Sequence, residues 1–180
     1  LDPETPIAHL GTDNNLVGNF YNKYGDIEEA FEQADHVLNV DFLEHRGGCH
    51  AMECRNILVN YDASLDETTI HLTTQAPFLI RRLMARFLEE DESRIRIVCP
   101  DVGGGFGPKN GPHPEEFVLA VVAKKLKRPV KWIEDRREHF TATWIAGDQQ
   151  WSMEIACDNE GKILGARGRV IHEMGAFVPY

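Results

Sequence analysis

Short stretches of alternating apolar and polar residues predict the strands of this chain. Two of them are separated by the turn-forming residues 62–67, which predicts a hairpin. A second hairpin is predicted near the C-terminal end, where residues 158–161 read Asp-Asn-Glu-Gly. The predicted strands are residues 37–42, 57–61, 69–73, 95–99, 130–133, 151–157 and 163–171.

Helical spacing and capping residues predict two main helices and one short one. Asp26, with Glu29 three residues later, forms a capping box that should open a short helix over residues 27–34. Pro77 and Pro114 each suit the first position of a longer helix. The helix after Pro114 is apolar nearly all round and should be buried. We therefore expect an α+β fold, with a mixed sheet and two main helices.

The first 25 residues differ from the remainder of the chain. They are rich in proline, glycine and short polar residues and show little periodicity, which predicts an extended arm or linker over residues 1–25. Residues 26–180 then form the folded part. The sequence ends at Pro179-Tyr180 without a terminating element, so we expect this folded part to be an incomplete portion of a larger domain.

Composition and charge narrow the classes of function. The 180 residues are 42% hydrophobic and include 29 acidic against 19 basic residues, a net charge of −10. A surface this acidic repels phosphate backbones and anionic lipids, which argues against nucleic-acid and membrane roles. No stretch approaches the roughly 18 apolar residues of a membrane span. An anionic ligand would therefore need a local binding device.

The four cysteines are scattered and include no Cys-x-x-Cys pair. No secretory signal is evident at the first residues. These features predict reduced thiols in a cytoplasmic protein, and a periplasmic enzyme that folds before export would show the same features.

The glycine run Gly103–Gly107 is the strongest local signal. Adjacent glycines without Cβ atoms let backbone N–H groups approach a bulky or anionic ligand. The run continues as Pro108-Lys109-Asn110, which matches neither a phosphate loop nor a dinucleotide fingerprint. A tight structural turn is an equally good interpretation of the spacing alone.

A second set of residues has the side chains of a metal site. Glu44, His45, Cys49, His50 and Cys54 lie within a short stretch, but their spacing matches no standard zinc pattern. We therefore favour the alternative of a buried thiol with exposed or hydrogen-bonded imidazoles.

Two further features have plain structural interpretations. Gln75 lies between a predicted strand and a predicted helix, where its amide could bind a group at the sheet edge or simply cap the helix. The charged run at residues 134–139 is typical of a solvated face with weak ion pairs, and we do not expect it to be catalytic.

Several segments taken together resemble a known family. The first of these segments is Met52-Glu53-x-Arg55. It is followed in order by Thr74–Pro77, by the run from Pro100 to Lys109, and by Arg128–Trp132 with Glu134-Asp135-Arg136. Residues 18–180 thereby resemble the N-terminal portion of the molybdopterin-binding region in the molybdenum-binding large subunit of the xanthine dehydrogenase, aldehyde oxidase and carbon monoxide dehydrogenase family.

The resemblance implies cofactor contacts at matching positions. In the family, the glutamine at the position of Gln75 hydrogen-bonds an oxo group on molybdenum, and the glycine loop places backbone amides against molybdenum and pterin. Here the loop residues are Gly104, Gly105, Phe106 and Gly107. Because the dithiolene of the cofactor binds the metal, no side chain of this chain is expected to ligate molybdenum directly. Gln75 and Phe106 are expected to lie near it.

Asn110 marks a departure from the purine-oxidising members, which carry a substrate-binding glutamate after the loop. This difference argues against xanthine as the substrate and makes Asn110 a candidate substrate contact. The family's catalytic base is a glutamate far downstream of this stretch. The resemblance therefore implies no catalytic residue within the chain, and we expect the isolated polypeptide to be inactive.

The implied function is that of a molybdenum hydroxylase that oxidises an aldehyde or an N-heterocycle with oxygen from water. The implied cofactor is molybdopterin with molybdenum, alone or as the cytosine dinucleotide. Electrons would pass to iron–sulfur clusters and FAD on partner domains or subunits. The partners would be the remainder of the molybdenum subunit, an iron–sulfur subunit and a flavin subunit. Two alternatives stay open: a cofactor-free fragment acting as an assembly or interaction subunit, and a plain anion-binding domain.

Overall fold

The computed structural model describes residues 4–175, which fall into two compact units. One unit is formed by residues up to Gly47 together with those from Gly147 onward, and the other by Gly48–Ala146. The division was not predicted from the sequence. Its boundaries lie at Gly47/Gly48 and Ala146/Gly147.

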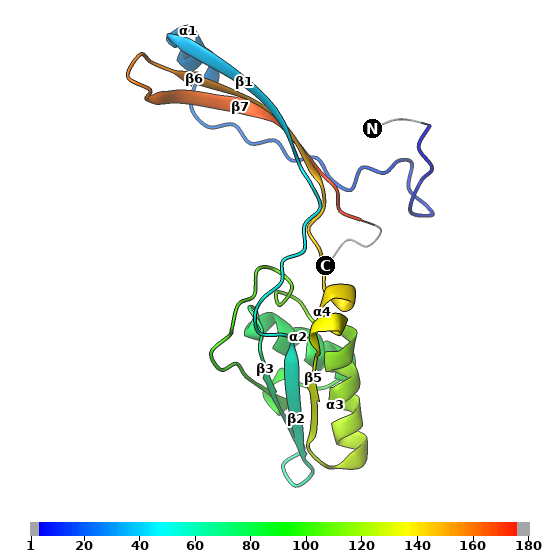
Figure 1. The fold of residues 1–180 in the computed structure, drawn as a ribbon. Coiled ribbons are helices and arrows are strands. Elements are labelled where there is room, and N and C mark those ends of the chain that lie inside the picture. The colour runs from blue at the N-terminus through cyan, green and yellow to red at the C-terminus, as the bar shows by residue number, and fades with distance from the viewer. Residues whose placement is uncertain (1–3, 176–180) are drawn as a thin grey trace. The chain divides into compact units, whose positions relative to one another are not determined.

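The Gly48–Ala146 unit is built on a four-stranded sheet with the order β4-β3-β2-β5 (Figure 1). The central pair β2–β3 is the predicted hairpin, and β5 also pairs antiparallel with β2. Strand β4 instead lies parallel to β3, so the sheet is mixed. The strands are β2 (Asn56–Asp62), β3 (Glu67–Leu72), β4 (Ile95–Val98) and β5 (Val130–Ile133).

Two long helices pack on this sheet, α2 (Pro77–Leu88) and α3 (Pro114–Leu126). A proline opens each of them, as predicted, since the first helical N–H needs no partner within the helix. Their apolar faces join the alternate inward residues of β2 and β3 in one core. The buried members are Ile57, Val59, Ile70, Leu72, Ile80, Met84, Ala85, Ile95, Ala120 and Ala123.

The connection from β3 through α2 to β4 brings two segments to one edge of the sheet. Because β3 and β4 are parallel neighbours, their carboxyl ends meet at one edge of the sheet. The segment that leads into α2 and the long segment between β4 and α3 both leave from that edge. In sheets with parallel strands, such an edge is where ligands bind.

The other unit is a three-stranded antiparallel sheet, ordered β1-β6-β7, with the short helix α1 beside it (Figure 1). Helix α1 packs on β7, where the absence of a side chain at Gly165 admits Ile27 and Ala30. Residues 4–25 contain turns and bends without a helix or strand. The elements are α1 (Ile27–Glu32), β1 (His36–Glu44), β6 (Gln149–Cys157) and β7 (Ile163–His172).

The predicted α+β class, with a mixed sheet and two main helices, is confirmed. The sequence pattern did not separate the strands into two sheets, and it missed the 3-10 turn η1 (Glu92–Arg94) and the helix α4 (Arg136–Ala142). In the described residues, no helix has the length and apolar character required to cross a membrane.

Candidate functional site

The structure brings Gln75 and the glycine loop together at the carboxyl ends of β3 and β4. The loop returns to the sheet at Lys109, whose carbonyl oxygen accepts hydrogen bonds from the Gln75 N–H at 2.8 Å and the Thr74 hydroxyl at 3.0 Å. Residues that are more than thirty positions apart therefore form one local structure. The sequence could order these motifs but could not show this contact.

The side chain of Gln75 lies against the loop. Its Oε1 accepts a hydrogen bond from the Gly107 N–H at 3.0 Å, so its amide NH₂ remains the group that can donate to a ligand. A Cβ at Gly105 would lie 2.3 Å from Gln75 Cδ, which shows how closely the carboxamide covers the glycine. The interpretation of Gln75 as a helix cap is wrong, because the N-cap position of α2 is Ala76.

The loop backbone turns sharply at three residues with positive φ, namely Gly104 (+98°), Phe106 (+54°) and Gly107 (+102°). Phe106 is the one residue of the three with a side chain, and 69% of it is exposed to solvent. A left-handed conformation at a non-glycine residue costs about 1–2 kcal/mol and often marks a functional position.

Three consecutive backbone amides in the loop are available to a ligand. Within residues 4–175, the N–H groups of Gly104, Gly105 and Phe106 donate no hydrogen bond, whereas those of Gly103 and Gly107 bind side chains. Unpaired amides beside glycines form the kind of concavity that binds anions. The loop thus offers the local device that the acidic composition requires.

A buried pair at the start of α3 supports the loop from its C-terminal side. His113 Nε2 donates to the Pro108 carbonyl at 2.7 Å, and His113 forms a capping box with Glu116. Burial is the main reason that the pKa of His113 is lowered, and burial raises the pKa of Glu116 to about 7. Both side chains can therefore be neutral near pH 7 beneath the loop.

The charged run at residues 134–139 is only partly the solvated face that the sequence predicts, because Asp135, Arg137 and Glu138 are exposed whereas two other members are buried. Glu134 is 2% exposed and His139 is fully buried. Arg55 binds Glu134 through its backbone N–H and two side-chain nitrogens, while His139 Nδ1 lies 2.8 Å from the other side of the same carboxylate. Burial would raise the pKa of Glu134, but the Arg55 hydrogen bonds outweigh it and lower the pKa.

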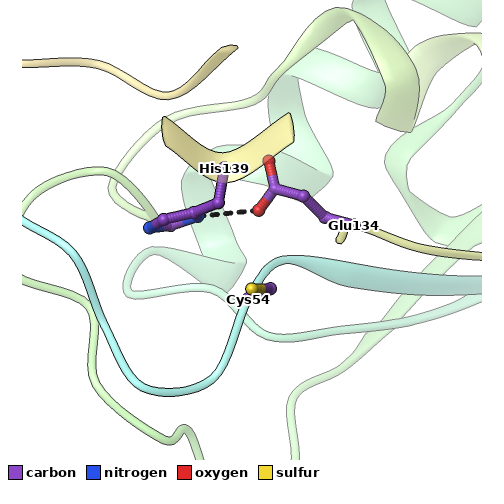
Figure 2. A group of neighbouring side chains, drawn as sticks. All are labelled: Cys54, Glu134 and His139. Carbon is purple, nitrogen blue, oxygen red and sulfur yellow. Dashed lines mark hydrogen bonds and ion pairs between the residues drawn. The ribbon is translucent and has the colours of Figure 1, made fainter. Parts of the chain in front are cut away.

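Cys54 completes a group that has the side chains of a metal site, shown with Glu134 and His139 in Figure 2. The ligand atoms of the three lie within 4.8 Å of one another. However, the Glu134 carboxylate is already neutralised by Arg55, so a cation would have to displace an existing ion pair. The three residues are better explained as part of the scaffold than as a metal centre.

The residues first considered as a metal cluster divide between the two units. Glu44 and His45 belong to one unit, while Cys49, His50 and Cys54 belong to the other. Cys49 and Cys54 are half-buried rather than buried, and the His50 ring makes an edge contact with Phe140 at 4.6 Å between centroids. Of the five, only Cys54 enters a possible ligand group in the described part of the chain.

A further side chain from α4 fixes the segment that lies under the glycine loop. Arg136, in the first turn of α4, donates to the carbonyl oxygens of Ala51 and Met52 at 2.8 and 2.5 Å. A Cβ at Gly104 would lie 3.1 Å from that of Ala51, so the segment fixed by Arg136 packs directly under the loop. Sequence reasoning missed this role of Arg136, although the motif that contains it was identified.

Asn110 lies at the end of the loop and is exposed. Its backbone N–H donates to the Gly107 carbonyl at 2.9 Å. Among the described residues its side chain makes no hydrogen bond, so the carboxamide is free to contact a ligand. Its assignment as a substrate contact stays a prediction.

Comparison with known proteins identifies the family. The model of the molybdopterin cofactor-binding domain matches residues 9–180. Over 98% of its length, the chain is 36% identical to the nicotine 6-hydroxylase large subunit of Paenarthrobacter nicotinovorans and to the carbon monoxide dehydrogenase large chain of Afipia carboxidovorans. It spans only 22% and 24% of those two proteins.

Solved structures agree with the sequence match. A copper- and molybdenum-containing carbon monoxide dehydrogenase superposes on 94% of the chain with a TM-score of 0.70 and 29% identity, and the chain covers 23% of it. Quinoline 2-oxidoreductase from Pseudomonas putida covers 81% of the chain with a TM-score of 0.65 and 34% identity, and the chain covers 18% of that protein. This chain belongs to the molybdopterin cofactor-binding domain family of the xanthine dehydrogenase-type molybdenum oxidoreductases.

Proposed function

We propose that this chain contributes one wall of the cofactor site in a molybdenum hydroxylase that oxidises an N-heterocycle or an aldehyde. The observation that carries the proposal is the position of the Gln75 carboxamide over a glycine loop with three unpaired amides. Because the chain spans about a quarter or less of the relatives described above, the activity belongs to a larger assembly.

The residues present fit a molybdopterin cofactor. The unpaired N–H groups of Gly104, Gly105 and Phe106 can bind its anionic and carbonyl groups, and the glycines keep side chains out of its way. The cofactor would bring its own dithiolene sulfurs as metal ligands, so the proposal requires no ligating side chain at the loop. When bound, the cofactor supplies the redox chemistry.

Each residue of the site then has a distinct task. The Gln75 oxygen is held by the Gly107 N–H, which leaves the NH₂ group as the donor that would hydrogen-bond an oxygen ligand of a bound molybdenum. Phe106 presents an exposed ring at the loop tip, where it can border the substrate. Asn110 follows as a neutral group that can contact a substrate without adding charge.

The names of the relatives guide the choice of substrate and partners. They refer to nicotine, quinoline and carbon monoxide, and several describe a large chain or one lettered subunit of a complex. We extend this to an N-heterocycle or aldehyde substrate, with iron–sulfur and flavin groups on partner domains or subunits as electron acceptors. The proposal includes molybdopterin either alone or as the cytosine dinucleotide, and a cytoplasmic location.

The test is to purify the complete protein that carries this chain and to assay a panel of N-heterocycles and aldehydes with an artificial electron acceptor in ¹⁸O-labelled water. We expect label in the hydroxylated or carboxylated product, and a loss of about ten- to hundred-fold in activity for Gln75→Ala. Gln149→Ala, an exchange of the same kind in the other unit, is the control. If no substrate is oxidised and the protein is isolated without molybdenum and pterin, the alternative of a cofactor-free assembly subunit replaces this proposal.

A further inference from the structure

The glycine loop has little internal support in the structure. Between residues 103 and 110 the hydrogen bond from the Asn110 N–H to the Gly107 carbonyl is the one backbone bond that closes within the described loop. Three positive φ angles, one of them at Phe106, add conformational strain. The separation of the two ends of the loop must therefore be set by groups outside it.

Glu53 binds both ends of the loop with one carboxylate oxygen. Its Oε2 accepts a hydrogen bond from the Gly103 N–H at 2.8 Å and one from the Lys109 ammonium at 2.8 Å. The backbone of Glu53 adds a third contact, from its N–H to the Gly103 carbonyl at 3.2 Å. Gly103 and Lys109 are the residues on either side of the segment that carries the unpaired amides.

The packing around this contact is close. A Cβ at Gly103 would lie 2.6 Å from Glu53 Cβ, so only glycine allows the carboxylate to reach the backbone there. The Lys109 side chain is 1% exposed, whereas that of Glu53 is 31% exposed. Burial would raise the pKa of Glu53, but the Lys109 ammonium and the Gly103 N–H together outweigh it and lower the pKa. The carboxylate is therefore charged at neutral pH.

A buried lysine this close to a cofactor loop could instead attract an anionic ligand directly. The geometry argues against that role, because the ammonium already binds Glu53 and is almost completely covered by protein. The backbone carbonyl of Lys109 accepts hydrogen bonds from the Thr74 hydroxyl and the Gln75 N–H. Lys109 thus joins the strand end that carries Gln75 to the loop and to Glu53.

We propose that Glu53 and Lys109 are positioning residues that clamp the two ends of the glycine loop and hold its amides and Gln75 in the arrangement that binds the cofactor. The inference rests on the proposed function, because it assigns the clamp a role at that site. It goes beyond the contact residues themselves, since neither side chain needs to touch the cofactor.

The experiment uses the complete protein purified from its host in four forms: wild type, Glu53→Leu, Lys109→Met and the double variant. Glu53→Leu leaves a buried ammonium without a partner and should strongly destabilise the protein. The double variant removes both charges and replaces them with apolar side chains of similar size, so its stability should return toward wild type. Glu92→Leu, which breaks the more exposed Arg81–Glu92 pair, is the matched control.

The decisive readout is molybdenum and pterin content per folded chain, measured together with the unfolding midpoint. The clamp predicts that the double variant recovers its stability but retains about ten- to hundred-fold less cofactor or activity, with kcat reduced more than KM. A double variant that regains wild-type cofactor content and kcat along with its stability would show a purely structural pair and overturn the inference. Wild-type protein without molybdenum and pterin would instead refute the proposed function, which separates the two failures.

Discussion

Replacing Gly105 by alanine should damage the site through Gln75 and leave the fold nearly intact. The added Cβ would lie 2.3 Å from Gln75 Cδ and 2.5 Å from its Oε1, so the carboxamide has to move. Gln75 is exposed, so its side chain can swing away from the new methyl group. The alanine itself adds no backbone strain, because Gly105 does not have a left-handed φ. The movement breaks the 3.0 Å hydrogen bond to the Gly107 N–H.

The expected cost in stability is small. One hydrogen bond of this kind contributes about 0.5–1.5 kcal/mol. A glycine-to-alanine exchange at a compatible backbone position returns about 0.4–1 kcal/mol by restricting the unfolded chain. The net change in the free energy of unfolding should therefore stay within about 1 kcal/mol. Activity, in contrast, should fall about ten- to hundred-fold because the NH₂ group of Gln75 is misplaced.

A double-mutant cycle tests the mechanism. If Gly105→Ala acts by displacing Gln75, combining it with Gln75→Ala should cost no more than the larger single effect, within about 0.5 kcal/mol. The assay is kcat/KM and molybdenum content of the complete protein, with Gly47→Ala as the control because its Cβ would meet nothing closer than 4.0 Å. If the double variant instead loses kcat/KM by the product of the two single losses, the two substitutions act independently and the proposed mechanism is wrong.

Three further perturbations test the scaffold and the loop. Arg55→Met removes the guanidinium that pairs with the buried Glu134 carboxylate and should lower the free energy of unfolding by about 3–5 kcal/mol in urea titrations, against under about 1 kcal/mol for Arg81→Met in a more exposed pair. Glu116 has a pKa of about 7 in the folded chain, so its contribution to stability is present below its ordinary pKa of 4.5 and is lost as the pH rises through 7. Between pH 5 and pH 8, this loss lowers the free energy of unfolding by up to about 3 kcal/mol. Glu116→Gln, which keeps the capping box, should remove most of that decline, and a free energy of unfolding that depends on pH as in the wild type would contradict this. Phe106→Gly relieves a positive φ and should leave the unfolding midpoint unchanged or higher while activity falls, and wild-type activity would argue against a role for the ring.

Much of the fold could be predicted because its signals are local. Pro77 and Pro114 open helices where the sequence placed them, and the turn at residues 62–67 joins β2 and β3 as expected. The short helix α4 was missed because its charged first turn looks solvated. The buried Glu134 that His139 contacts is paired with Arg55, about eighty positions earlier, and no local pattern carries that information.

The candidate site was predictable only in part for the same reason. The glycine run and Gln75 stand out in the sequence, and their contact follows from the parallel pairing of β3 and β4. Glu53 and Lys109 both lie in sequence motifs that resemble the family, but nothing in their spacing shows that the two side chains meet. Their ion pair is a tertiary contact across more than fifty residues.

The most direct test of the central claim is the molybdenum, pterin and iron content of the protein that carries this chain, purified from its native host by a tag. We predict molybdenum and pterin near one per chain, accompanied by iron, and loss of both molybdenum and pterin when Gly105 is replaced by a bulky residue. Protein that is folded and assembled yet contains neither molybdenum nor pterin would contradict it.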